Sequence, residues 1–226
     1  MHWTDIGLIL VAGLDLGMAL LIWLKNPRNK INVSLGVAIL LLAIWTFGIA
    51  MLREAVTPQA IIFWARSLNV GGITLIIPFL LFTIYFPYQT FNLSSQTKWF
   101  ILFSIIGILV VLFVPDLWFI RNSVVISPPH NNYQISLGYY LFNIYFLFYL
   151  CWSYYNLFRK FTASVGFVRT QLGFILAGTG VISFFGTALG AISPIFFNLK
   201  YFWLGPYFAL PMIVCLLYFG FYYRPK

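Results

Sequence analysis

Two residues of opposite charge stand inside long apolar stretches of the sequence and are its first candidates for chemistry. Asp15 lies in the apolar run 6–24, and Arg66 lies in the run 59–86. A guanidinium in hydrocarbon costs at least about 2.5–3.5 kcal/mol on insertion scales unless it meets a partner or a water-filled cavity. By helical rise the two residues lie roughly 14 Å and 10 Å from the same side of a membrane. Asp15 is therefore the best intramembrane partner for Arg66, either as a structural ion pair or with one or both contacting a ligand.

Further polar side chains extend this candidate site. Asn69 follows Arg66 by three residues and shares its helix face. Thr179, Ser183 and Thr187 are spaced by four, so their hydroxyls either bond to their own helix or line a cavity. Small-molecule sites are usually apolar and aromatic with a few convergent polar groups. The candidate ligand-binding residues are Asp15, Trp45, Trp64, Arg66, Asn69, Asn143, Ser183, Thr187 and Tyr207.

Catalytic and metal-binding patterns are absent from the apolar runs. They contain no paired carboxylates and no Ser/His/Asp set. Cys151 and Cys215 have neither a CxxC spacing nor a neighbouring histidine, which favours packing over a disulfide or a metal site. A retinal photoreceptor would need a lysine inside the seventh span, whereas Lys200 precedes it and Lys226 follows it. We expect no catalytic residue, no metal, no cofactor and no enzyme activity.

The elements that must position these residues are membrane helices. The chain has 226 residues, of which 62% are hydrophobic and only 8% charged, whereas a soluble domain carries about 25% charged residues. The first apolar run has no basic stretch before it, so it is interpreted as an uncleaved helix and not as a signal peptide. The sequence predicts an all-α, polytopic seven-helix bundle in a single domain, 1–226, with spans at about 6–24, 33–52, 59–86, 99–114, 139–158, 171–192 and 204–223.

The distribution of the net charge of +9 sets the orientation and does not indicate nucleic-acid binding. One side of the membrane holds nine basic residues: Lys25, Arg28, Lys30, Lys98, Arg159, Lys160, Arg169, Arg224 and Lys226. The other side holds three: Arg53, Arg121 and Lys200. This places the N-terminus outside and the C-terminus in the cytoplasm. On the outside, residues 117–137 combine alternating apolar residues with a Ser-Pro-Pro turn, which predicts either a β-hairpin lid or a solvated connector.

Several stretches resemble a known family. NPRNKINVSLGVAILLLAIWTFGIAM and AIIFWARSLNVGGITLIIPFLLFTIYFP are similar to the N-terminal seven-transmembrane region of bacterial histidine kinases, which also precedes diguanylate cyclase outputs. Residues 169–173, 204–206 and 222–224 add RTQLG, LGP and YYR to the resemblance. The resemblance implies a two-component sensor domain in the bacterial inner (plasma) membrane.

The expected function follows from the resemblance and the spans together. A small or lipophilic ligand, or the state of the membrane, would be sensed in an outer-half cavity, and the signal would leave through helix seven, where Pro211 could supply a kink. The expected partners are membrane lipid, an unidentified small molecule and a cytoplasmic output domain or partner kinase outside these 226 residues, with a homodimer left open and no nucleic acid. The alternative is a small transporter of an apolar or anionic solute, which the lack of an internal repeat and of an acidic relay disfavours.

Overall fold

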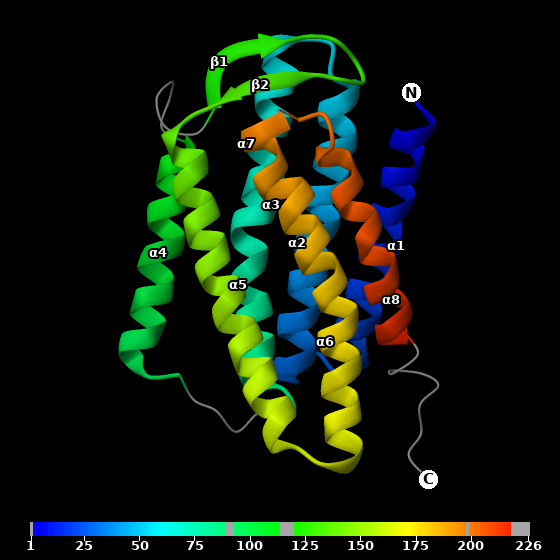
Figure 1. Ribbon diagram of the computed structural model, residues 1–226, viewed down its shortest axis with the longest axis vertical. Helices are drawn as coiled ribbons and strands as arrows, with labels where there is room; N and C mark the ends of the chain where they lie inside the picture. Colours follow the sequence, from blue (N-terminus) through cyan, green and yellow to red (C-terminus); the bar gives the residue numbers. More distant parts are fainter. Residues whose placement is uncertain (1, 89–92, 114–119, 198, 218–226) are drawn as a thin grey trace.

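The computed structural model describes residues 2–88, 93–113, 120–197 and 199–217. Within them, seven helical runs form an elongated bundle with one two-stranded hairpin across an end (Figure 1). Five of the runs are long and apolar enough to cross a membrane: α1, α2, α3, α4 and the run Gly166–Phe197. The helices are α1 Trp3–Lys25, α2 Lys30–Glu54, α3 Pro58–Tyr85, α4 Ser95–Phe113, α5 Leu137–Ala163, α6 Gly166–Gly186, the π-helix η1 Thr187–Ile192, α7 Ser193–Phe197, the 3-10 helix η2 Phe202–Phe208 and α8 Ala209–Leu217.

Local sequence explains why the first three helices are close antiparallel neighbours. The Asn29 side chain accepts a hydrogen bond from the backbone N–H of Ile31 at 2.8 Å, which caps the start of α2. The Thr57 hydroxyl accepts a hydrogen bond from the backbone N–H of Ala60 at 3.2 Å, which caps the start of α3, and Pro58 occupies its first turn. Because each connection is only a few residues long, α1 packs on α2 and α2 packs on α3.

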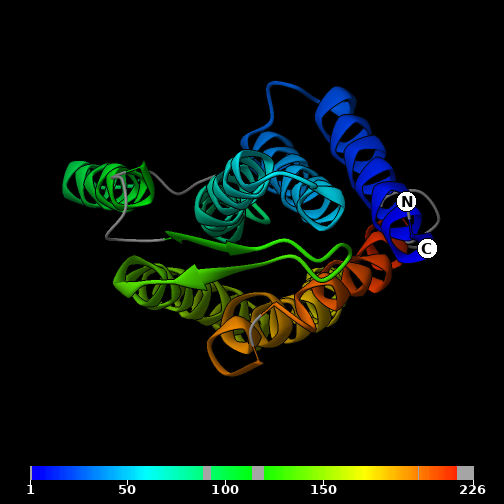
Figure 2. The same cartoon turned by 90° about the horizontal axis from the view of Figure 1, so that it is seen from above.

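The helices are arranged in two layers, which is clearest from above (Figure 2). Helices α2 and α3 face α5, α6 and the η2–α8 run, α1 closes one end and α4 lies at the other. Two thirds (67%) of the α3 span is buried against only 17% of the α4 span. Helix α3 is therefore central, whereas α4 presents large apolar side chains such as Phe103 and Val110 outward, as a lipid-facing helix does.

The hairpin consists of β1 Ile120–Val125 and β2 Asn132–Ile135, which pair antiparallel with Val124 opposite Tyr133. It lies across the bundle at the end where α2 finishes and α3 begins, called here the hairpin end (Figure 1). Which side of the membrane this end faces remains a prediction. The predicted hairpin residues 117–119 and the last part of the predicted seventh span, 218–223, lie outside the described residues.

Several helices run further than the sequence indicated, α5 and the sixth run the most. Helix α5 continues to Ala163 through residues expected in a loop, because Lys160 bonds to the end of α3 and keeps that turn ordered. The sixth run continues past 192 to Phe197, because the change to a π-helix accommodates Pro194. Pro211 lies in the first turn of α8, directly after the 3-10 segment, so the change of helix type stands where a proline kink was expected.

Candidate functional site

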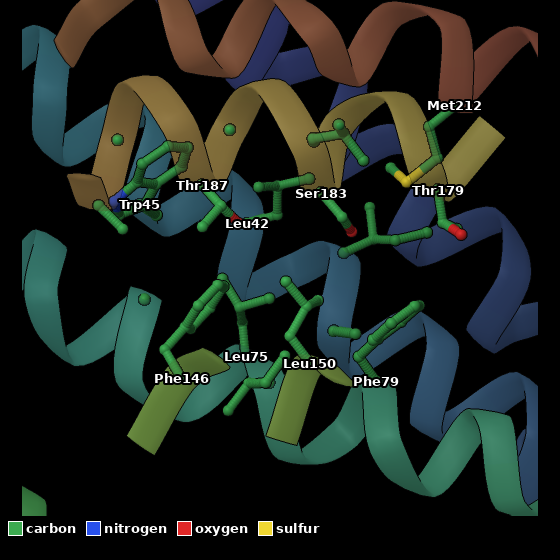
Figure 3. A pocket seen from close by; sticks show the side chains of 18 of the residues that line it. Leu42, Trp45, Leu75, Phe79, Phe146, Leu150, Thr179, Ser183, Thr187 and Met212 are labelled. Atoms are coloured by element: carbon green, nitrogen blue, oxygen red, sulfur yellow. The ribbon is translucent and has the colours of Figure 1, made fainter. Parts of the chain in front are cut away.

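A cavity of about 100 Å³ lies between the two helix layers (Figure 3). Helices α2 and α3 form one wall, and α5, α6, η1 and α8 form the other. From Leu35 to Trp45 on α2 it extends ten residues, roughly 15 Å by helical rise, so it is not confined to the hairpin-end half. Its lining is mainly hydrocarbon, with side chains such as Leu42, Leu75, Phe79, Phe146, Leu150 and Met212.

The polar part of the lining comes mostly from one face of the sixth run. Thr179, Ser183 and Thr187 all line the cavity. The Thr179 hydroxyl donates to the carbonyl oxygen of Ile175 at 2.6 Å, and the Tyr154 hydroxyl of α5 donates to Ser183 Oγ at 2.8 Å. The Thr179 hydroxyl thus bonds to its own helix, and all three residues line the cavity.

Trp45 closes the cavity toward the hairpin end. Its ring packs directly on the backbone of the opposite layer, because a Cβ at Gly190 would lie 2.8 Å from the ring and one at Gly205 would lie 3.3 Å from it. It also meets Phe202 edge to face, with ring centroids 5.9 Å apart. One indole on α2 thus contacts both the sixth run and η2, and only glycine at position 190 permits so close an approach.

The π-helix η1 lies beside this contact. Pro194 has no N–H, so the carbonyl of Gly190 lacks the donor that an α-helix would provide. The Tyr139 hydroxyl of α5 lies 3.2 Å from the Gly190 oxygen and 3.1 Å from the Ala191 oxygen and donates there. A neighbouring helix thereby satisfies the backbone that the proline leaves open, as membrane bundles require. Single π-turns inside α-helices occur frequently at functional sites.

The expected ion pair between Asp15 and Arg66 is wrong. Both carboxyl oxygens of Asp15 are buried without a hydrogen-bond partner among the described residues, while Arg66 is half-buried on α3. Helical rise predicts the depth of a residue but not its direction around the helix. Asp15 belongs to the buried stripe of α1 with Val11 and Met18, and α2 lies between α1 and α3 (Figure 2).

A buried ion pair between other residues lies at the hairpin end. Arg53 Nε lies 2.5 Å from Asp5 Oδ1, and the two side chains are 9% and 0% exposed. The guanidinium also donates to Thr4 Oγ1 at 3.1 Å and stacks 5.0 Å from the ring centroid of Trp203. The Tyr207 hydroxyl donates to the Thr4 carbonyl at 2.8 Å. This group joins α1, α2 and η2, and the sequence signal for it was opposite charge at two span ends on one side.

The hairpin is fastened to the helix ends and to the cavity wall. The Asn131 side-chain amide donates to the carbonyl oxygens of Leu52 at 2.9 Å and Ala55 at 2.6 Å, which caps α2. Tyr133 on β2 is buried and hydrogen-bonds to the side chain of Asn69, a cavity-lining residue. Burial raises the pKa of Tyr133 to about 12, although the bond to Asn69 lowers it.

Comparison with known proteins decides the family. The family model for the N-terminal 7TM region of histidine kinases matches residues 7–224. The chain belongs to this family. Comparisons with curated proteins and with solved structures gave no match. As a histidine-kinase 7TM region with apolar membrane-length helices, it is a multi-pass membrane protein of the kind found at the N-terminus of histidine kinases.

In this histidine-kinase 7TM region, four of the nine predicted site residues line the cavity: Trp45, Asn69, Ser183 and Thr187. The other five lie elsewhere. Trp64 packs on Phe47 with ring centroids 5.8 Å apart. The Asn143 side-chain amide donates to the Tyr139 carbonyl oxygen at 2.8 Å, and the Tyr207 hydroxyl bonds to Thr4 of α1. Asp15 and Arg66 do not line the cavity either.

Sequence reasoning missed Gly72 and the leucines and phenylalanines that supply most of the lining. Gly72 carried a signal, since glycine inside an apolar span often marks a close approach. The apolar residues carried none, because the same types face lipid elsewhere in the chain.

Proposed function

We propose that this chain is the sensory input domain of a bacterial inner-membrane receptor, with the N-terminus outside and the C-terminus in the cytoplasm. It takes a small or lipophilic ligand between its two layers and signals through α8 to a cytoplasmic kinase or other output. The observation that carries the proposal is a cavity whose wall includes both layers and Met212 of α8.

The packing of α8 supports this route. A Cβ at Gly178 of α6 would lie 2.9 Å from Cys215 Cβ, so the two helices touch closely and shift together. A ligand between the layers changes the spacing of α6 and α8 from α2 and α3, and a ligand must favour one arrangement to move the equilibrium. The domain binds and transmits and carries out no reaction, and its lipid-facing surface meets the bilayer.

Filling the cavity tests the proposal. In the chain joined to a histidine-kinase output, Gly72→Leu places a side chain in the cavity beside Trp45, where a Cβ has ordinary contact distances of 3.6–3.8 Å. We expect autophosphorylation to change about five-fold or more in either direction, the lower end of usual coupling between sites. Gly107→Leu on α4 is the matched control, because Gly107 has nothing within 4 Å.

Two results would contradict the sensor function. One is unchanged autophosphorylation in Gly72→Leu at normal membrane levels of the protein. The other is saturable uptake of a solute into proteoliposomes by this chain alone, which would favour the carrier alternative.

A further inference from the structure

One hydroxyl in the cavity wall has no hydrogen-bond partner. Thr187 is 8% exposed, lines the cavity, and its Oγ1 is buried without a donor or acceptor among the described residues. The neighbouring lining groups are already bonded: Thr179 to Ile175 and the Asn69 amide to the Ala65 carbonyl at 2.6 Å. A buried polar group left unbonded is costly, so Thr187 is a polar contact that the cavity offers to an occupant.

Thr187 stands where the sixth run changes from an α-helix to a π-helix. A threonine in an α-helix normally donates to the carbonyl three or four residues back, as Thr74 does to Val70 at 2.6 Å. At Thr187 the helix begins its π-turn, and the Ser193 N–H bonds five residues back to Ala188. The Thr187 N–H still bonds to the carbonyl oxygens of Ser183 and Phe184 in the preceding α-helical turn, but its hydroxyl bonds to neither and lies in the cavity wall (Figure 3).

The rest of the lining sets the charge of the occupant. Among the described residues that line the cavity there is no Asp, Glu, Lys, Arg or His. An ion placed there would lose its hydration without a counter-charge, which costs several kcal/mol. A neutral hydrocarbon body suits the leucine and phenylalanine walls, and one polar group suits Thr187.

We propose that the cavity is a binding site for a neutral, mainly apolar molecule whose single hydrogen-bonding group meets Thr187 at the start of the π-helix. This names the ligand class of the sensor proposed above and rests on that function only for its biological role. The volume of about 100 Å³ is below the roughly 150 Å³ of a cavity that takes benzene, so it holds about four carbons of the occupant, and a longer apolar chain extends beyond it.

Binding of six-carbon probes to the chain in lipid nanodiscs tests the site, with empty nanodiscs subtracting partition into lipid. The probes are 1-hexanol, hexane, hexanoate and hexylammonium, measured by titration calorimetry. We expect saturable binding of 1-hexanol, with hexane weaker by about three- to ten-fold, the worth of one net hydrogen bond. Both charged probes bind at least about ten-fold more weakly than 1-hexanol.

Variants assign the polar contact. Thr187→Val removes the hydroxyl at nearly constant shape and lowers 1-hexanol affinity about three- to ten-fold, to the level of hexane. Thr187→Ser keeps the hydroxyl and should keep the 1-hexanol affinity of the unaltered chain. Thr74→Val is the control: the Thr74 hydroxyl bonds to its own helix, so its loss should leave the affinity unchanged. If Thr187→Val does not fold, the comparison of hexanol with hexane in the unaltered chain still decides.

Equal affinity for hexane and 1-hexanol, binding of either ion as tight as that of 1-hexanol, or no saturable binding of any probe would each overturn the inference. Its failure is separable from that of the sensor function. If 1-hexanol binds as expected but autophosphorylation is unchanged in Gly72→Leu, the neutral-ligand site stands and the sensor role is wrong. If autophosphorylation changes but the probes do not bind as expected, the sensor role stands and only the ligand class is wrong.

Discussion

At the residue scale, Asp15 and Arg66 do not share the environment that the sequence predicted for them. The sequence predicted a shared depth for Asp15 and Arg66, and depth follows from helical rise alone. Contact also requires that both side chains point across the same helix interface, which depends on the packing of α1, α2 and α3 together. Arg53 and Asp5 satisfy that requirement at the hairpin end. Residue chemistry was therefore predictable, but pairing was not.

Asp15 provides a test of its buried environment. Asp15→Leu keeps the branching of the side chain and removes a carboxyl that has no partner among the described residues. We expect the variant to be more stable by about 1–3 kcal/mol, the cost of a buried unsatisfied polar group. The thermal unfolding midpoint in detergent measures the change.

The matched control is Asp5→Leu, which removes the carboxylate that faces Arg53. It leaves a buried guanidinium unpaired, so we expect a loss of about 3–5 kcal/mol. A lower midpoint for Asp15→Leu would mean that Asp15 has a stabilising partner in the folded protein, and the description of an unpaired carboxyl would be wrong.

At the element scale, the positions of the helices were predictable and their ends were less so. Apolar runs long enough to span a bilayer are a strong signal, and each predicted span corresponds to a helical run of the structure. The ends depend on contacts that are distant in sequence. Lys160 was counted as a loop residue, yet its ammonium donates to the carbonyl oxygens of Thr83, Ile84 and Phe86 at 2.8, 2.7 and 2.5 Å. This cap holds the end of α3 against α5, in the other layer.

Removing this cap should loosen the end of the bundle opposite the hairpin. Lys160→Met keeps most of the aliphatic side chain but leaves three carbonyls at the end of α3 without their donor. We expect a loss of about 1.5–3 kcal/mol, the usual worth of hydrogen bonds to a charged group, seen as a lower thermal midpoint. Lys160→Arg should retain most of the stability, and Lys98→Met, at an exposed position, should change little. Equal midpoints for Lys160→Met and Lys98→Met would show that the cap contributes nothing.

At the scale of the whole molecule, the two-layer arrangement and its cavity were not predictable from the sequence. Many leucines and phenylalanines line the cavity and many others face outward, and residue type does not separate the two groups. The layers are set by close backbone approaches, such as Trp45 on Gly190, which bring distant spans together. The charge distribution, in contrast, predicts an orientation without any knowledge of packing.

That orientation can be tested with the fold as a guide. Ser127, in the exposed turn of the hairpin, and Ser164, between α5 and α6, lie at opposite ends of the bundle. With Cys151 and Cys215 replaced by serine, a single Ser127→Cys should react with a membrane-impermeant maleimide in intact spheroplasts. Ser164→Cys should react only after the membrane is opened, because nine basic residues against three place its loop in the cytoplasm. The reverse pattern would invert the topology: the hairpin and the Arg53 ion pair would then face the cytoplasm, and α8 could not deliver a signal to an output on that side.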